Sequence, residues 1–382
     1  MKKNKSVEFN AILNAFRMTL TIIVPIITFP YTSRIFLSEG SGKLSFASSY
    51  IQVFVILASL GVYTYGVREG ALVRNNKALF SQLVFELLII NIISTVFSYL
   101  LLFFSMILSN KLNDYRVLIY INAISIGFMA LGMDWIYGVY EDYVYITVRQ
   151  IIVQLITIIL MFILVHNKED IYVWALIGVI PYAIANVINV YKARKYFDFR
   201  KISRPNIKKH ICPILILFAT QVSAKVYSSL DTILLGFFTN DVRTGLYSAA
   251  IKVNSILITL FTAMPPVFIP TIMDYIKKNN SKDFLNQMKK VFRMCLGLAI
   301  PACVGIMILS KEIIMILAGK EFEAASRSMV ILSPIIIITT MSNIVYYCIL
   351  TPYKKEKEVL KCMIMSTLVN ILISILLIHS MK

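Results

Sequence analysis

About eleven apolar stretches, each long enough to cross a bilayer, occupy this chain almost from end to end. A bilayer core about 30 Å thick requires roughly 20 predominantly apolar residues per helix. Hydrophobic residues make up 58% of the 382 residues and charged residues only 15%, and the mean hydropathy is +0.76. The sequence therefore predicts an all-α integral membrane protein. We place the spans at residues 10–37, 44–66, 79–108, 116–139, 144–165, 170–190, 211–238, 246–271, 291–310, 328–350 and 359–379.

The net charge of +18 would suit a nucleic-acid partner, but the positions of the charges argue against one. With the N-terminus in the cytoplasm, 25 of the 38 Lys and Arg residues fall on the cytoplasmic side of the predicted spans and 10 on the other. Short cytoplasmic loops carry this excess in multi-pass membrane proteins. We therefore expect a cell-membrane protein with a cytoplasmic N-terminus and no nucleic-acid partner.

The main hydrophilic connection, residues 191–209, divides the chain into two lobes. Residues 1–190 form a six-helix N-terminal lobe, and residues 210–382 form a C-terminal lobe of about five helices. The connection is basic and aromatic, so it suits an amphipathic segment on the anionic cytoplasmic leaflet. A solvated linker explains the same composition equally well, and the sequence leaves both interpretations open.

The second half of the chain repeats features of the first at a nearly constant offset. The segment Asn75–Phe80 resembles Asn279–Phe284, 204 positions later, and Leu44–Ser49 resembles Gly245–Ala250 at a similar offset. At the 204-residue offset, Gly61 and Gly66 correspond to Pro265 and Pro270. Because the offset preserves the direction of crossing, the sequence predicts parallel repeats about an axis along the membrane normal, as in transporters.

Prolines interrupt predicted spans in both lobes. Each interior proline removes a backbone hydrogen bond, so we expect helix kinks at these positions. Kinks in both lobes suit helices that change shape between two states of a transporter, although packing alone also explains them. The residues are Pro25, Pro30, Pro265, Pro266 and Pro270.

Several motifs in both halves resemble the polysaccharide-biosynthesis flippases of the MOP (multidrug/oligosaccharidyl-lipid/polysaccharide) exporter superfamily, whose fold is MATE-like. One is the segment Leu131–Gln150, which contains Asp134-Trp135, and another is Pro30-Tyr31-x-x-Arg34. The others are Leu60-Gly61-x-x-x-x-Gly66-x-Arg68-Glu69, Asp231-x-x-x-Leu235-Gly236 and Gly245-Leu246-Tyr247-Ser248-Ala249-Ala250.

The resemblance implies two six-helix lobes around a cavity that faces each side of the membrane in turn. It also implies a cargo, an undecaprenyl-pyrophosphate-linked oligosaccharide repeat unit moved outward for capsule or O-antigen assembly, with other polysaccharide-assembly proteins as partners. Family members usually have twelve or fourteen spans. We expect about eleven here, so the C-terminal lobe looks one helix short, and a truncated inactive paralogue stays an alternative.

Charged side chains within the spans are costly unless they are paired or face water, which makes them candidates for function. Lys225 lies mid-span among small and polar residues, and a lysine there suits the diphosphate of the cargo. A structural pairing with a carboxylate is the alternative for Lys225. Arg17 and Arg34, in the first span, are further candidate cavity cations, and Arg17 can also extend to the interface.

Other intramembrane charges suit structural or coupling roles. Glu86 can pair with Arg149 or Arg17. Asp134 lies beside Trp135 at the start of an aromatic cluster that suits an interfacial belt better than a sugar-stacking site. Four amide side chains, which can bind sugar hydroxyls or join helices, are those of Gln154, Asn186, Asn189 and Asn343.

Other functional classes fit less well. A cation-coupled drug antiporter of the same superfamily would favour an acidic residue in the first span, where this chain has Arg17 and Arg34. The three histidines lie near span ends without a paired carboxylate motif, so we do not expect a membrane enzyme. The chain contains no Walker-type loop, and its five cysteines show no metal-type spacing, so we expect no ATPase, cofactor or metal.

Asp231 and Lys252 generate the first prediction. Each lies about six residues from the same end of two consecutive spans, so they share a depth at 1.5 Å per residue and can form a structural or gating ion pair. We expect Asp231→Lys or Lys252→Asp alone to abolish transport and the double reversal to restore it, measured as export of the cargo. Failure of the double variant to restore export would count against the pair.

Overall fold

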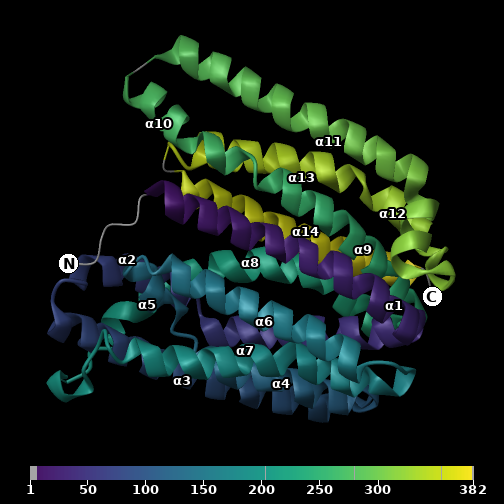
Figure 1. The fold of residues 1–382 in the computed structure, drawn as a ribbon, viewed down its shortest axis with the longest axis horizontal. Coiled ribbons are helices and arrows are strands. Elements are labelled where there is room, and N and C mark those ends of the chain that lie inside the picture. Colours follow the sequence, from purple (N-terminus) through teal and green to yellow (C-terminus); the bar gives the residue numbers. More distant parts are fainter. Residues whose placement is uncertain (1–6, 203, 279, 354, 381–382) are drawn as a thin grey trace. The chain divides into compact units, whose positions relative to one another are not determined.

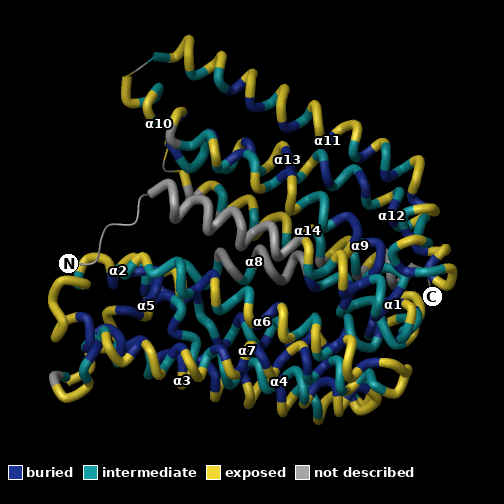
Figure 2. Tube along the Cα trace, in the orientation of Figure 1, coloured by how far each residue is buried: buried dark blue, intermediate teal, exposed yellow. Residues whose placement is uncertain are grey.

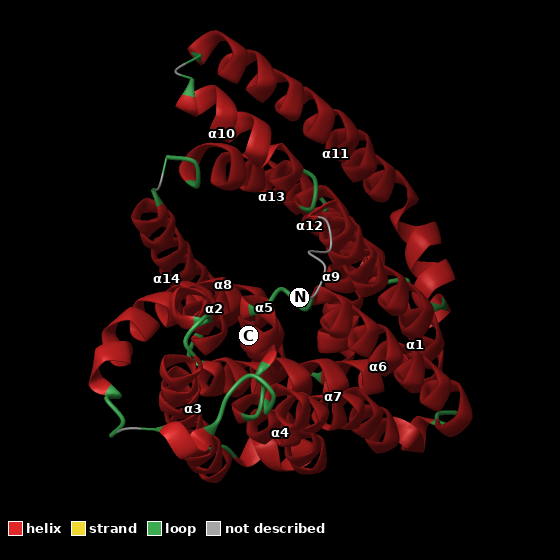
Figure 3. Ribbon diagram, turned by 60° about the vertical axis from the view of Figure 1, so that its left-hand side comes forward, coloured by secondary structure: helices red, strands yellow, loops and turns green. Residues whose placement is uncertain are grey.

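The computed structural model describes residues 7–202, 204–278, 280–353 and 355–380, and helices make up almost all of this part of the chain. Short loops join the helices (Figure 3). Seven segments of the described chain are long and apolar enough to cross a membrane. The chain is an all-α, multi-pass membrane protein, and its number of crossings, expected to be about eleven, stays a prediction.

Within the described residues, the first half of the chain folds into the helices α1 to α7, which Figure 1 labels. The helix α1 is continuous except at Leu37, which has non-helical angles of φ 55° and ψ −168°. A 3₁₀ turn, Asn110–Tyr115, links α3 to α4. The helices are α1 (Val7–Ser59), α2 (Val62–Val73), α3 (Lys77–Leu108), α4 (Arg116–Ala130), α5 (Asp134–Val139), α6 (Tyr143–Leu164) and α7 (Ile171–Ala193).

The second half contains α8 (Lys208–Phe238), α9 (Asp241–Thr262), α10 (Ile269–Lys277), α11 (Ser281–Ala318), α12 (Ala325–Leu332), α13 (Pro334–Val345) and α14 (Glu356–Ser380). Between α9 and α10 the chain passes through a short 3₁₀ helix, Pro265–Phe268, where two prolines remove backbone donors. Pro270 follows within the first turn of α10, a position that tolerates proline. A π-helical turn, Tyr346–Leu350, extends α13.

Contacts divide the described chain into two compact units. The first unit contains Met1–Val24 and Lys43–Phe237, and the second contains Pro25–Gly42 and Phe238–Lys382. The helix α8 therefore groups with the first unit, whereas the division drawn from the sequence places it in the second lobe. The lobe boundaries at 190 and 210 stay a prediction.

The helix α3 shows how the first unit is built for a membrane. Exposed and buried residues alternate along this helix (Figure 2). The exposed ones include large apolar side chains such as Phe103, at 62% exposure, and the buried ones include polar side chains. The Ser94 hydroxyl donates to the Ala58 carbonyl at 2.6 Å, and the Ser98 hydroxyl donates to the Phe54 carbonyl at 2.7 Å. Hydrogen bonds of this kind join helices where the surroundings offer no water.

In the second unit, residues 25–42 of α1 pack against the ends of other helices. Gly42 and Gly245 are in such close contact that a Cβ on Gly42 would collide with the Asp241 carbonyl, and one on Gly245 with the Ser38 carbonyl. The kink at Leu37 leaves the Ser38 N–H outside the helical ladder, and the Glu321 carboxylate accepts from it at 3.1 Å. Glu321 thereby caps the portion of α1 that follows the kink.

The repeated Asn-Asn motif has the same structural role in both units. The Asn76 side chain accepts from the backbone N–H groups of Ala78 and Leu79 and caps α3. The Asn280 side chain accepts from the Asp283 N–H and caps α11. Two equivalent helices therefore begin at equivalent residues, which agrees with the two-lobed parallel repeat.

These caps generate the second prediction. Asn76→Ala and Asn280→Ala should each lower the free energy of unfolding by about 1 kcal/mol, because each leaves N-terminal N–H groups of a helix without an acceptor. Thermal unfolding of the detergent-solubilised protein measures the effect. Asn→Asp at either position keeps the acceptor and should retain the wild-type midpoint; a comparable loss there would contradict the capping role.

Candidate functional site

A break in the fourth predicted span begins the candidate site. The sequence predicts one span over residues 116–139, but α4 ends at Ala130 and α5 begins only at Asp134. The expected uninterrupted span is therefore wrong. The break places the carboxylate of Asp134 in the first turn of α5, where the helix dipole favours a negative charge.

The helix α5 lies against α2 through a close glycine contact. A Cβ on Gly66 would lie 2.6 Å from the Trp135 ring, and one on Gly70 would lie 2.7 Å from Val139. Only glycine allows α2 to approach the indole this closely. The Gly66 motif and the Asp134-Trp135 motif, which are far apart in the sequence, therefore meet at this contact.

The aromatic cluster that follows Asp134 is largely internal. Trp135 is 3% exposed and Tyr137 is 0% exposed, and both belong to the apolar core of the first unit. The Tyr137 hydroxyl donates to the Asn189 carbonyl at 2.7 Å. The expectation that these two side chains form an interfacial belt is therefore wrong, because Trp135 packs against α2 and Tyr137 joins α5 to α7.

Asp134 and Arg149 form the ion pair at the centre of the site. The Arg149 guanidinium donates to both carboxylate oxygens, at 2.6 Å and 3.0 Å. The Asn189 amide donates to the same carboxylate at 2.6 Å, and the Tyr145 hydroxyl donates to the Asn189 side-chain oxygen at 2.8 Å. This bidentate pair fixes both side chains and leaves the remaining Arg149 donors available to a ligand.

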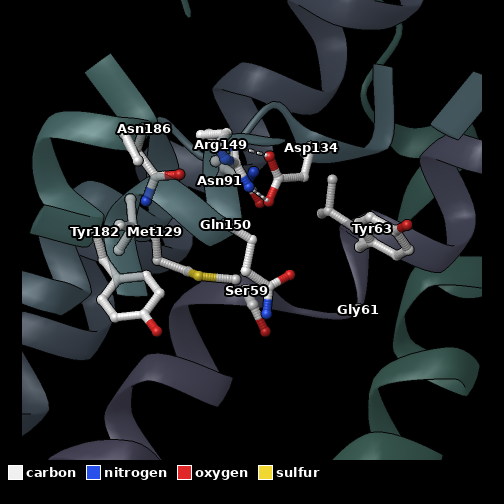
Figure 4. A pocket seen from close by; sticks show the side chains of 14 residues that line it. Ser59, Gly61, Tyr63, Asn91, Met129, Asp134, Arg149, Gln150, Tyr182 and Asn186 are labelled. Atoms are coloured by element: carbon white, nitrogen blue, oxygen red, sulfur yellow. Dashed lines mark hydrogen bonds and ion pairs between the residues drawn. The ribbon is translucent and has the colours of Figure 1, made fainter. Parts of the chain in front are cut away.

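A cavity of about 360 Å³ opens beside this pair, within the size range of small-molecule sites (Figure 4). Helices α1 to α7, together with the α4–α5 break, contribute to its wall. Its lining is mixed, with carboxylate, guanidinium, amide, hydroxyl and aromatic groups. The lining residues are Ser59, Gly61, Val62, Tyr63, Asn91, Met129, Gly132, Asp134, Arg149, Gln150, Val153, Tyr182, Ala185 and Asn186.

Uncharged polar groups dominate the rest of the wall. Tyr182 and Asn186 are four residues apart on α7 and share a face, and Gln150 follows Arg149 on α6. Among the described residues, the side-chain oxygen of Asn91, a wall residue, has no hydrogen-bond partner, but it is buried and therefore closed to a ligand. Between them, the hydroxyl, amide and guanidinium groups of the wall donate and accept hydrogen bonds, so the cavity suits a polyhydroxylated ligand.

Glu86 lies in a separate cluster. Its basic partners are Lys209 at 2.9 Å and His210 at 2.7 Å, whereas the sequence predicts Arg149 or Arg17. The pairing of Glu86 with Arg149 is therefore wrong, since Arg149 binds Asp134. His210 does have a paired carboxylate, which the sequence did not reveal because the two residues are 124 positions apart.

The predicted cavity cations differ in how far the structure describes them. Arg34 is exposed and donates to the Ile316 carbonyl at 2.6 Å, near the end of α11 where carbonyls lack helical partners. Lys225 and Arg17 belong to α8 and α1, and their side chains lie outside the described residues. Their assignment to a cavity stays a prediction.

Asp231 and Lys252 lie on α8 and α9 and belong to different units. The Lys252 ammonium lies 5.0 Å from the centre of the Phe29 ring, a cation–π contact within the second unit. The Asp231–Lys252 pair stays a prediction. Among the described residues, no group of three or more His, Cys, Asp or Glu side chains could hold a metal ion.

Sequence reasoning missed several residues of the site. Ser59, Tyr63, Asn91 and Tyr182 line the cavity but carry no motif, and only their contribution from different helices brings them together. A signal was present in α3, where Glu86, Asn91, Thr95 and other polar residues recur at helical spacing within an apolar span. Such a stripe indicates a face turned toward the protein interior.

Comparisons with known proteins agree with this architecture. The family model described as "Polysaccharide biosynthesis protein" matches residues 9–276. The "Putative O-antigen transporter" of Escherichia coli (strain K12) is 22% identical over 377 residues, which cover 98% of this chain and 90% of that protein. The "Probable low-salt glycan biosynthesis flippase Agl15" of Haloferax volcanii is 24% identical over 161 residues, covering 42% of this chain and 34% of its own length.

One solved structure has a similar fold. It is an inward-facing multidrug resistance MATE family transporter of the MOP superfamily, with a TM-score of 0.62 and 12% sequence identity. The match covers 91% of this chain and 88% of the transporter. At this identity the likeness establishes the MATE-like fold alone.

The Asp134–Arg149 pair generates the third prediction. Asp134→Ala should lower the free energy of unfolding by about 3 kcal/mol, because it leaves the mostly buried guanidinium of Arg149, 16% exposed, without its carboxylate. Arg68→Gln is the matched control, since the Arg68–Glu69 pair is more exposed and should contribute at most about 1 kcal/mol. Equal thermal midpoints for the two variants would contradict a special role for the internal pair.

Proposed function

The chain belongs to the polysaccharide biosynthesis protein family, and we propose that it is a flippase that moves lipid-linked oligosaccharide units across the cell membrane for surface polysaccharide assembly. The observation that carries the proposal is the polar cavity beside the Asp134–Arg149 pair, in a unit whose helix α3 exposes large apolar side chains. A membrane protein that only anchors other proteins has no use for such a cavity.

The chemistry of the wall matches the glycan part of such a cargo. Sugar hydroxyls both donate and accept, and the site offers acceptors at Asp134 and Asn186 and donors at Arg149, Tyr182 and Gln150. Arg149 is already neutralised by Asp134, so the cavity as a whole favours an uncharged ligand over a bare diphosphate. We therefore assign the cavity to the sugar of the cargo.

The diphosphate then needs a cation elsewhere. Arg34 already donates to backbone carbonyls, which makes Lys225 on α8 the first candidate for this role, followed by Arg17. In this mechanism the two lobes alternately open to each side of the membrane, the lipid tail stays in the bilayer, and no covalent bond is made or broken. The N-terminus lies in the cytoplasm, as the distribution of basic residues predicts.

Deletion of the gene tests the proposed function directly. We expect lipid-linked repeat units to accumulate in the inner leaflet and surface glycan to disappear, and expression of the wild-type chain to restore both. Normal surface glycan in a deletion strain, with no accumulation of lipid-linked units, would overturn the flippase function.

The cavity generates the fourth prediction. Asn186→Ala should reduce glycan export about tenfold, because loss of one or two hydrogen bonds to the cargo costs about 1.4 kcal/mol. Asn122→Ala is the matched control; Asn122 donates to the Leu118 carbonyl on its own helix, α4, and does not line the cavity. Equal export by the two variants, at equal amounts of protein in the membrane, would remove the cavity from the mechanism.

Lys225→Ala addresses the second part of the same mechanism. If Lys225 binds the diphosphate, its loss should abolish export, whereas Lys225→Arg retains a cation and should keep part of it. Export by Lys225→Ala at the wild-type level would overturn this assignment without affecting the assignment of the cavity.

A further inference from the structure

Glu86 is the one acidic side chain among the buried residues that the structure describes, with 1% of its surface exposed. It lies on α3, nine residues after the start of that helix at Lys77. A lone carboxylate in this position would be strongly destabilising, so its partners have to compensate for the loss of water.

Four hydrogen bonds provide this compensation, two to each carboxylate oxygen. Oε1 accepts from the Gln82 amide at 2.8 Å and from the Asn206 backbone N–H at 2.8 Å. Oε2 accepts from His210 Nε2 at 2.7 Å and from the Lys209 ammonium at 2.9 Å. Three of the partners, the Gln82 amide, the Asn206 N–H and the Lys209 ammonium, can only donate, which favours an ionised carboxylate, and beside it we assign the tautomer of His210 with its proton on Nε2.

The cluster extends from Glu86 to a third helix through His210. With its Nε2–H donating to Glu86, the imidazole accepts at Nδ1 from the Tyr65 hydroxyl of α2 at 2.7 Å. Tyr65 is 4% exposed and His210 is also 4% exposed. Glu86 therefore joins α2, α3 and the start of α8, segments that are far apart in sequence.

Other contacts hold the rest of α8 to the same unit. Gly61, at the start of α2, has φ 72° and lies so near α8 that a Cβ would be 3.2 Å from the Phe218 backbone nitrogen. At the far end, the Lys111 ammonium donates to the Phe237 carbonyl at 2.8 Å, and the Phe46 and Phe237 rings meet edge to face with centroids 5.2 Å apart. Contacts within the first unit therefore hold α8 at its start, within its first half and at its end.

We propose that Glu86 is a positioning residue that fixes the start of α8 to α2 and α3, so that α8 moves as one body with the first unit. The chain passes from α8 directly into α9, which belongs to the second unit. If the second unit moves during transport, side-chain contacts have to keep α8 with the first unit. Glu86 then controls transport without touching the cargo. The transport part of this inference rests on the proposed flippase function, and the positional part does not.

Cys212, an exposed cysteine in the first turns of α8, provides a reporter of the helix position. With the other exposed cysteine removed by Cys362→Ser, a spin label on Cys212 and another at Leu108→Cys report the distance from the start of α8 to the end of α3. Leu108 is 86% exposed, so a label there is tolerated, and the remaining cysteines are buried. Pulsed electron paramagnetic resonance on the full chain in lipid gives the distance distribution.

Glu86→Gln is the test variant, because it keeps the shape of the side chain but puts amide donors against the surrounding donors. We expect the distance distribution to become at least about twice as wide and cargo flipping to fall about tenfold or more. Glu86→Asp keeps the charge and should recover part of both properties. Glu141→Gln, which removes a carboxylate from an exposed ion pair with Arg74, is the control and should change neither.

Each outcome decides a separate part of the inference. An unchanged distance distribution in Glu86→Gln overturns the positioning role of Glu86, whether or not the protein flips the proposed cargo. A widened distribution with wild-type flipping overturns the link to transport alone. Where Glu86→Gln does not fold, His210→Phe keeps a ring of similar size without N–H groups, cuts the connection to Tyr65, and is expected to give the same widening.

Discussion

Hydrocarbon supplies no hydrogen-bond partner, so polar side chains placed among apolar helices have to find partners within the chain. In the first unit this requirement is met by pairing residues from different helices. The serines of α3 donate to carbonyls of α1, Asp134 accepts from Arg149 and Asn189, and Glu86 accepts from four donors. These polar contacts set which helices lie together, because apolar side chains gain little by exchanging lipid for protein.

The same requirement separates structural from functional polar groups. Glu86 has all its acceptor capacity used by protein donors, so it has none left for a ligand. The cavity beside Asp134 differs, since its wall holds the polar side chains of Tyr182 and Asn186 and an arginine whose N–H groups are only partly used by Asp134. A transporter needs both kinds of site, saturated ones to keep helices together and unsaturated ones to exchange water for cargo.

The sequence predicted the helices well and their contacts less well. Apolar length indicated an all-α membrane chain, and the Asn-Asn repeat marked two helix starts, because capping depends on residues within one turn. The α4–α5 break escaped prediction, since residues 131–133 differ little in composition from the helix before them. Trp135 and Tyr137 were assigned to an interface because sequence cannot tell which face of α5 meets α2 and α7.

What the sequence by itself determined was the class of protein: an all-α membrane chain with two related halves, whose basic residues and motifs indicate a polysaccharide-biosynthesis exporter. Only the tertiary structure decided the ion pairs and the cavity, placing Glu86 with His210 and Arg149 with Asp134. The physical reason is the distance along the chain over which each signal acts. Apolar length, caps and prolines act within a few residues of the chain, whereas a charge inside a lobe takes the nearest partner in space, which packing brings from any helix.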